Sequence, residues 1–190
     1  NYFFFIFKNN TITKINPEIS ILLPTSGSTG IPKFVCISYE NLITNTASII
    51  KYLKIKKMST TITSLSSGYS YGLSVINTHL FAGSKIVINK FSFLDSKFWK
   101  LFKINKVNFL YTVPIMCEIL FKNIKINDSL KQLKTLCCAG GHLDQKIKKN
   151  ILISLRNKNI FIMYGQTEAS PRISYIDISK NKKKFDSIGK

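Results

Sequence analysis

The chain has 190 residues, of which 45% are hydrophobic, and a formal net charge of +19 at pH 7. This length is enough to bury one sizeable core, so a single domain is expected. The charge raises the question of nucleic-acid binding, but Arg156 and Arg172 are the only arginines and the lysines are spread along the chain. Because base readout and bidentate phosphate contacts favour Arg, a solvated lysine surface is the better interpretation.

The first predicted elements are strands. The Phe-rich run 2–7 is too short to span a bilayer and is interpreted as a strand left over from a truncated domain. Apolar residues over 19–22 and 34–37 predict two buried strands on either side of a polar loop. Ser38 then provides a good N-cap for a helix that extends to about Lys51.

Strands and helices alternate through the rest of the chain. A polar strand-like run predicts a strand over 60–65, and apolar runs predict further strands over 85–88, 107–113, 133–139 and 160–163. Helical spacing predicts helices over 73–81, 94–104, from Pro114 onward, and over 143–155, where apolar residues share one face and lysines lie elsewhere. This rhythm is typical of an α/β fold with a largely parallel sheet and flanking helices.

Three glycine-containing loops follow predicted strands, at Gly27/Gly30, at Gly140/Gly141 and at Gly165. In parallel sheets, ligands bind beyond the carboxyl ends of the strands. We therefore expect these loops to converge on one site.

Several chemically versatile residues lie in apolar patterns and are interpreted as packing residues: His79, Cys117 and the Cys137–Cys138 pair. Within a strand, Cys137 and Cys138 face opposite sides. The four cysteines show no C-x-x-C spacing, which argues against a disulfide framework or a zinc site and favours a reducing cytoplasm. An aromatic cluster is likewise expected in the core: Phe91, Phe93, Phe98, Trp99 and Phe102.

The loop 23–33, with the sequence LPTSGSTGIPK, combines hydroxyls, glycines and Lys33. Glycine lets backbone N–H groups approach an anion, hydroxyls add donors, and lysine adds a positive charge. This composition predicts a phosphate-binding loop, although the spacing is not the Walker pattern. The later segment 163–169 brings an aromatic, a hydroxyl and a carboxylate to a strand end, which is suited to stacking on a base and holding Mg²⁺ against phosphates.

These two segments resemble motifs of the adenylate-forming superfamily, which includes acyl-CoA synthetases, adenylation domains of peptide synthetases and luciferases. The string TSGSTGIPK resembles its phosphate-binding loop, and the segment 164–168 resembles its Tyr-Gly-x-Thr-Glu motif, in the same order. The resemblance covers residues 19–190 and implies part of the large N-terminal domain. Residues 1–190 are thus expected to form a partial AMP-binding domain, with an N-terminal part and a small C-terminal domain missing.

The resemblance also implies roles for individual residues. It implies contacts to the β- and γ-phosphates of ATP by Thr25, Ser26, Gly27, Ser28, Thr29, Gly30 and Lys33. The adenine side of the pocket is assigned to Gly140, Gly141, His142, Tyr164 and Gly165. Thr167 is expected near the α-phosphate, and Glu168 is expected to bind Mg²⁺. The predicted catalytic residues are Lys33, Thr167 and Glu168.

The acyl and thiol channel is assigned by resemblance to Tyr69, Tyr71 and Gly72. Tyr69 stands where His is common in the family, which puts its gating role in doubt. His142 stands where Glu or Ala is frequent, so it is assigned only a lining role.

The activity implied by the resemblance is ATP-dependent conversion of a carboxylic acid to an acyl-adenylate, followed by transfer to the thiol of CoA. A ribose-binding Asp and a catalytic Lys are expected beyond Lys190, so this stretch alone is expected to be poorly active. The expected partners are a small carboxylic acid, ATP with Mg²⁺, and an acyl carrier protein as a further candidate. Neither nucleic-acid binding nor stable membrane insertion is expected.

Three alternatives stay open. The acceptor thiol could be the phosphopantetheine of a carrier protein in place of CoA. A basic nucleic-acid-binding module would show binding that weakens steeply with salt. A structural or inactive nucleotide-binding fragment is the third alternative, and the presence of Lys33, Thr167 and Glu168 argues against it.

Overall fold

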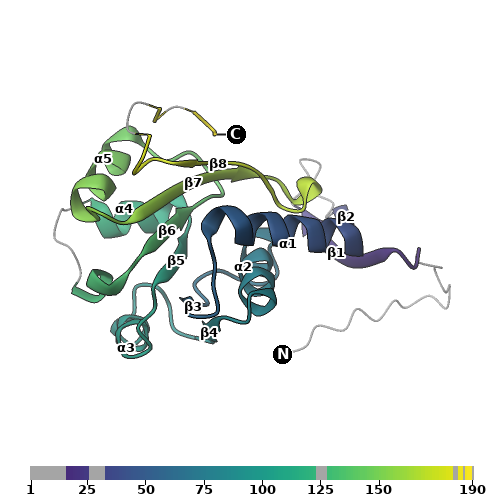
Figure 1. The fold of residues 1–190 in the computed structure, drawn as a ribbon, viewed down its shortest axis with the longest axis horizontal. Coiled ribbons are helices and arrows are strands. Elements are labelled where there is room, and N and C mark those ends of the chain that lie inside the picture. The colour runs from purple at the N-terminus through teal and green to yellow at the C-terminus, as the bar shows by residue number, and fades with distance from the viewer. Residues whose placement is uncertain (1–15, 26–32, 123–127, 182–183, 186, 190) are drawn as a thin grey trace.

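The computed structural model describes residues 16–25, 33–122, 128–181, 184–185 and 187–189 (Figure 1). The predicted strand 2–7 and the centre of the phosphate-loop candidate, residues 26–32, lie outside the described residues.

A six-stranded sheet forms the centre of the fold, with the strand order β4-β3-β5-β6-β7-β8. Pairing is parallel from β4 to β7, which confirms the predicted α/β class with a largely parallel sheet. The parallel strands are β3 (Thr60–Ile62), β4 (Lys85–Val87), β5 (Phe109–Thr112), β6 (Thr135–Cys138) and β7 (Asn159–Gly165).

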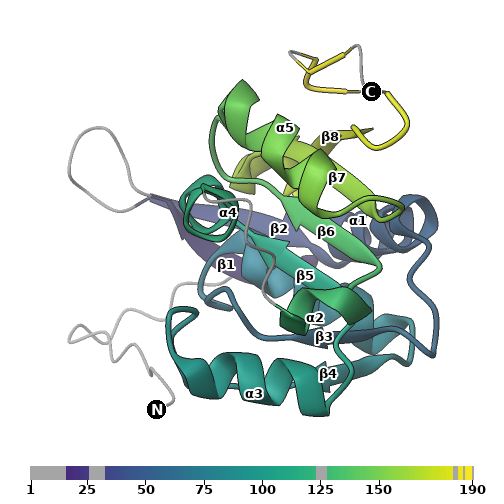
Figure 2. The same cartoon turned by 90° about the vertical axis from the view of Figure 1, so that its left-hand side faces the viewer.

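Helices cover both faces of this sheet (Figures 1 and 2). One face packs against α3 (Ser96–Ile104), α4 (Pro114–Phe121) and α5 (Gln145–Ser154), and the other against α1 (Tyr39–Leu53) and α2 (Ser70–Phe81). The sheet therefore has a hydrophobic core on each face. Cys138 lies in the core beneath α3, α4 and α5, and its neighbour Cys137 lies in the core beneath α1 and α2, because side chains alternate along a strand.

The helix starts follow local capping chemistry. Ser38 caps α1 as predicted, because its Oγ accepts a hydrogen bond from the Asn41 N–H at 3.1 Å. Pro114 is the first residue of α4, also as predicted. Helix α2 begins at Ser70, three residues before the predicted Leu73, so its first turn reaches into the segment that carries the expected acyl-channel residues.

The hairpin of β1 (Ile19–Thr25) and β2 (Lys33–Ser38) is a separate two-stranded antiparallel sheet. The prediction of two buried strands is wrong in part, because only Leu23 and Ile37 of this hairpin are buried. The hairpin packs beside the main sheet, against α1 and the 3₁₀ turn η2 (Thr167–Ala169), and the described residues leave much of it exposed.

A further strand that was not predicted, β8 (Arg172–Asp177), pairs antiparallel with β7 at the edge of the sheet. Only a short connection through η2 separates the two strands, and this length suits antiparallel pairing, whereas a parallel crossover needs a dozen or more residues.

The packing residues predicted from the sequence are buried. Cys117 lies in the core, and the aromatic cluster around Phe98 and Phe102 packs as expected. His79 is fully buried, and its Nε2 lies 3.0 Å from the Tyr111 hydroxyl. Burial, together with the positive charge of Arg172, lowers the pKa of His79 to about 4, so this imidazole is neutral at pH 7.

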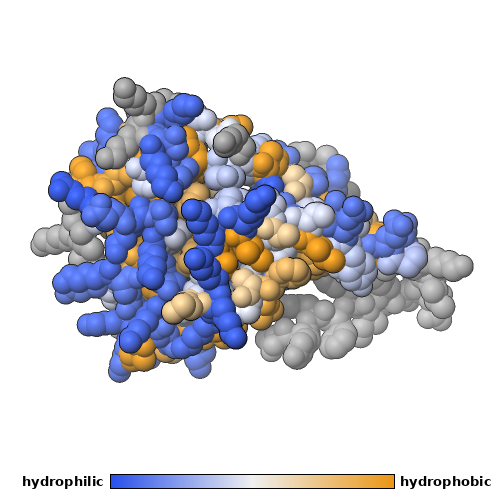
Figure 3. All heavy atoms as spheres, viewed as in Figure 1, coloured by the Kyte–Doolittle hydropathy of each residue, from blue (hydrophilic) through white to orange (hydrophobic). Residues whose placement is uncertain are grey.

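The lysines are distributed over several elements, including exposed positions of α1, α3 and α5. Figure 3 shows hydrophilic side chains spread over one face of the molecule, with hydrophobic groups between them. In the part of the chain that the structure describes, no helix combines the length and apolar character that crossing a bilayer requires.

Candidate functional site

The loops at the carboxyl ends of β6 and β7 meet, as the architecture predicts. The turn Gly140–Gly141 follows β6, and Tyr164–Gly165 ends β7. Gly140 has a φ of +89°, a conformation that favours glycine. Both loops line one cavity of about 440 Å³.

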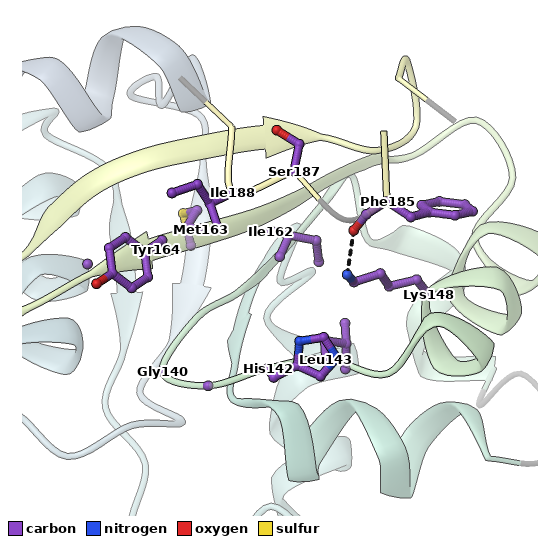
Figure 4. Close-up of a pocket in the computed structure, with 12 residues that line it drawn as sticks. Gly140, His142, Leu143, Lys148, Ile162, Met163, Tyr164, Phe185, Ser187 and Ile188 are labelled. Atoms are coloured by element: carbon purple, nitrogen blue, oxygen red, sulfur yellow. Dashed lines mark hydrogen bonds between the residues drawn. The ribbon is translucent and has the colours of Figure 1, made fainter. Parts of the chain in front are cut away.

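This large cavity lies between the turn after β6 and the end of β7. Figure 4 shows Gly140, His142 and Leu143 along one side of it, and Ile162, Met163 and Tyr164 along another. Tyr164 is 41% exposed, and its hydroxyl accepts a hydrogen bond from Gln166 Nε2 at 2.9 Å. A glycine backbone on one side and an aromatic ring on the other form a slot suited to a planar heterocycle.

Lys148 also lines the large cavity, although the sequence analysis placed the lysines of this helix away from its apolar face. Only 5% of its surface is exposed, and its Nζ donates a hydrogen bond to the Phe185 carbonyl at 2.6 Å (Figure 4). The contact joins α5 to the segment after β8. Periodicity alone could not reveal it, because its acceptor is a backbone group 37 residues away.

A smaller cavity, of about 160 Å³, adjoins the large one. The two share Gly140, Met163, Tyr164 and Gly165. The rest of the small cavity is lined by Ser70, Tyr71, Ala139, Gln166, Thr167, Pro171 and Arg172. Tyr71 lines it, and its hydroxyl donates to the Cys137 carbonyl at 3.4 Å.

The other residues expected in the acyl channel lie elsewhere. Tyr69 is 71% exposed, and neither Tyr69 nor Gly72 lines either cavity. A Cβ on Gly72 would lie 2.0 Å from the Ser66 carbonyl oxygen, so close backbone packing accounts for this glycine. The same holds for Gly165, where a Cβ would lie 1.9 Å from the Pro171 carbonyl oxygen.

Thr167 and Glu168 are neighbours in η2 but line different cavities. Thr167 lines the small cavity, and its Oγ1 lies 3.1 Å from Ser70 Oγ, which connects η2 to α2. Glu168 is exposed and lines a separate groove of about 370 Å³, together with Cys36 and polar side chains of α1. The structure therefore brings Thr167, but not Glu168, to the cavities that Tyr164 lines.

Thr25 and Lys33 are paired at the loop end of the β1–β2 hairpin, on either side of residues 26–32, and Thr25 Oγ1 donates to the Lys33 carbonyl at 3.4 Å. Neither residue lines the two cavities. The other predicted phosphate ligands, Ser26 to Gly30, lie outside the described residues. The hairpin nevertheless approaches the site, because β2 packs against η2.

Arg172, which no sequence pattern indicated, lines the small cavity although it is only 9% exposed. Its Nη1 donates to the Tyr52 hydroxyl at 3.1 Å and approaches Met163 Sδ at 3.0 Å, and its Nη2 donates to Ser74 Oγ at 3.1 Å. The guanidinium carbon also lies 4.9 Å from the centroid of the Tyr71 ring. One cation thus connects α1, α2, β7 and β8 directly beneath the site.

Glu168 is the candidate protein ligand for Mg²⁺. This ion keeps several waters and is usually held by one or two carboxylates together with substrate phosphates. Within the described ranges, no cluster of three or more His, Cys, Asp and Glu residues is present. Glu168 is a single exposed carboxylate beside the hairpin. It fits a Mg²⁺ ion that binds together with substrate phosphates, and not a Mg²⁺ ion held by protein ligands alone.

Comparison with known proteins places this geometry in a family. The family model described as "AMP-binding enzyme" matches residues 9–190. A probable 4-coumarate–CoA ligase of Dictyostelium discoideum is 30% identical over 83% of the chain and 29% of its own length. A D-alanine–D-alanyl carrier protein ligase of Lactococcus lactis is 28% identical over 86% of the chain and 33% of its own length. The chain thus spans about a third of the length of these relatives.

Solved structures agree on the fold. VinN in complex with L-aspartate superposes with a TM-score of 0.79 at 22% identity, over 95% of this chain and 46% of VinN. The o-succinylbenzoate CoA synthetase of Bacillus subtilis, in complex with ATP and magnesium, superposes with a TM-score of 0.77 at 22% identity, over 89% of this chain and 34% of that enzyme. With the family model covering nearly the whole sequence, the chain belongs to the AMP-binding enzyme family.

Proposed function

We propose that the full-length gene product is a ligase that activates a carboxylic acid with ATP and passes the acyl group to a thiol. The observation that carries this proposal is the pair of adjoining cavities, which share the wall formed by Gly140, Met163, Tyr164 and Gly165. Because the same four residues line both cavities, a nucleotide bound in one and an acid bound in the other would lie next to each other, as transfer between them requires.

The large cavity is the proposed nucleotide site. Adenine stacks on Tyr164 and lies against the backbone of Gly140 and Gly141, with His142 as a further lining residue. The loop 25–30 and Lys33 contact the β- and γ-phosphates. This arrangement is supported by the glycine-and-aromatic slot and by the packing of β2 against η2.

The small cavity is the proposed site of the acid, with Tyr71 as one of its walls. A carboxylate oxygen attacks the α-phosphorus of ATP, the new P–O bond forms, and pyrophosphate leaves with the electrons of the broken bond. In-line placement and neutralisation of charge dominate such a step. Thr167 is proposed to donate a hydrogen bond near the α-phosphate, and its contact with Ser70, which holds η2 against α2, supports this role.

Mg²⁺, when bound with ATP, neutralises phosphate charge in this step. Glu168 is the proposed protein ligand. Its place in the groove beside β2 supports contact with the phosphate end of the nucleotide, on the side of the hairpin.

CoA is the proposed acceptor, and the phosphopantetheine of a carrier protein is the alternative. The CoA-ligase relatives support the first, and the D-alanyl carrier protein ligase relative supports the second. Because the chain spans about a third of these relatives, the proposal concerns the full-length gene product, with residues 1–190 as part of its AMP-binding domain.

The decisive measurement is exchange of labelled pyrophosphate into ATP by the full-length gene product, with a library of carboxylic acids and Mg²⁺. Exchange that depends on one class of acid supports the proposal. ATP binding without exchange for any acid in the library refutes it. Thioester formation with CoA or with a phosphopantetheinylated carrier protein then identifies the acceptor.

A further inference from the structure

Arg172 carries a buried positive charge without a carboxylate partner in the described part of the chain. The two ion pairs found there join Lys131 to Asp128 and Lys180 to Asp177. Arg172 is surrounded instead by hydroxyl groups, a thioether and aromatic rings, and its Nε is buried without a hydrogen-bond acceptor. A guanidinium stays protonated in proteins, so this charge persists at every working pH.

The position of this charge relative to the two cavities is informative. The wall that the small cavity shares with the large one contains neither Arg172 nor Tyr71. A carboxylate that attacks the nucleotide lies at the shared wall. The remainder of the acid therefore lies in the part of the small cavity that Arg172 and Tyr71 line.

The other charges that face this region are few. The described residues that line the small cavity include no Asp or Glu, and Arg172 is the only charged one among them. His79, which is packed against Tyr111, is neutral at pH 7. An ammonium group in this space would meet a buried guanidinium without a compensating anion.

We infer that Arg172 determines substrate specificity: the small cavity accepts a short acid whose chain carries an oxygen acceptor, and rejects an acid that carries an ammonium group. The inference rests on the proposed function and names its substrate class. The hydroxyl, keto or second carboxylate oxygen of such an acid is attracted by the guanidinium charge, which has no carboxylate partner among the described residues. The cavity volume of about 160 Å³ corresponds to about five waters at liquid density, which suits an acid of about four carbons.

The expected selectivity follows from electrostatics. Two unit charges about 7 Å apart, at an effective dielectric constant of about 20, repel strongly enough to change an affinity about 50-fold. Side-chain rearrangement and water reduce this effect, so at least tenfold discrimination is expected.

The test uses four acids of similar length: butanoate, 3-hydroxybutanoate, succinate and 4-aminobutanoate. Their binding to the full-length gene product is measured by titration calorimetry, and pyrophosphate exchange is measured separately. We expect 3-hydroxybutanoate or succinate to bind at least tenfold more tightly than 4-aminobutanoate, and more tightly than butanoate. The inference is overturned if 4-aminobutanoate binds as tightly as 3-hydroxybutanoate and succinate, or more tightly. It is also overturned if butanoate binds most tightly of the four, or if none of the four acids binds.

The two assays separate the inference from the proposed function. The expected order of binding without exchange for any acid in the wider library supports the inference and refutes the function. Exchange that is as fast with 4-aminobutanoate as with succinate supports the function and refutes the inference.

Matched variants test whether the charge of Arg172 causes the discrimination against 4-aminobutanoate. Arg172→Gln keeps an N–H donor but removes the charge, and it is expected to reduce the discrimination to less than threefold. Arg172→Lys keeps the charge and is expected to retain the discrimination. Because Arg172 also connects two helices to the sheet, the melting temperature of each variant is measured. If Arg172→Gln does not fold, the binding of the four acids to the wild-type protein decides the inference.

Discussion

Replacement of Gly165 by alanine tests whether this glycine is present for packing. A Cβ at this position would lie 1.9 Å from the Pro171 carbonyl oxygen, 2.9 Å from its carbonyl carbon and 3.0 Å from Arg172 Cα. All three neighbours are backbone atoms at the end of the β7–β8 ladder, in which Gly165 pairs with Arg172. No side-chain rotation can relieve the overlap, so the ends of the two strands must separate.

The cost is at the upper end of the range for overpacking, about 3 kcal/mol. In a cooperative unit of about 150–250 residues this destabilisation lowers the melting temperature by about 6–12 °C, and the shift is smaller in a longer cooperative unit. The separation also displaces Tyr164 and Arg172, so pyrophosphate exchange is expected to fall with stability.

Thermal unfolding of the full-length gene product, followed by circular dichroism, measures the effect. Gly68→Ala is the matched control, because a Cβ there would lie 3.4 Å from Ser66 Oγ, which is an ordinary contact distance. A Gly165→Ala melting temperature within about 1 °C of that of Gly68→Ala would refute the steric argument.

Three further predictions concern the site and its pH dependence. Tyr164→Ala is expected to weaken ATP binding by about 1–3 kcal/mol through loss of stacking, whereas Tyr164→Phe keeps the ring and most of the affinity; equal affinities of the two variants would contradict stacking. Ser70→Ala and Thr167→Val, which separate two hydroxyls 3.1 Å apart, are expected to show a coupling of about 1 kcal/mol in a double-mutant cycle of stability, and additive effects would exclude the contact. The pKa of His79 is lowered in the fold to about 4, so the stability it contributes is complete above its unfolded pKa and is lost as the pH falls from about 6.5 toward 4. Denaturant titrations at pH 7 and pH 5 should therefore differ by about 2 kcal/mol more in the wild type than in His79→Asn, and an equal loss in both would assign the pH effect to other groups.

Much of the fold could be predicted from local patterns. Alternation along a strand places Cys137 and Cys138 in different cores, and short-range capping by Ser38 and Pro114 starts two helices. These features depend on neighbours within a few residues, which the sequence displays directly. The two ordered motifs likewise indicated the family that the comparison with known proteins identifies.

The hairpin and β8 show where local patterns were insufficient. An apolar run indicates a strand but not how many of its faces are covered, so the exposure of Leu22 and Phe34 could not be predicted. The pairing of β8 depends on the geometry of η2, which turns the chain back beside β7.

The sequence by itself determined the α/β class, the order of the elements and the family motifs, because spacing, capping and composition act over short stretches of chain. Only the tertiary structure decided which charged residues are buried and which cavities the motif residues line. Arg172 contacts Tyr52 and Ser74, 120 and 98 residues away in sequence, and Lys148 bonds a backbone carbonyl 37 residues away. A buried cation is stabilised by partners that folding brings together, and no pattern around Arg172 itself records them.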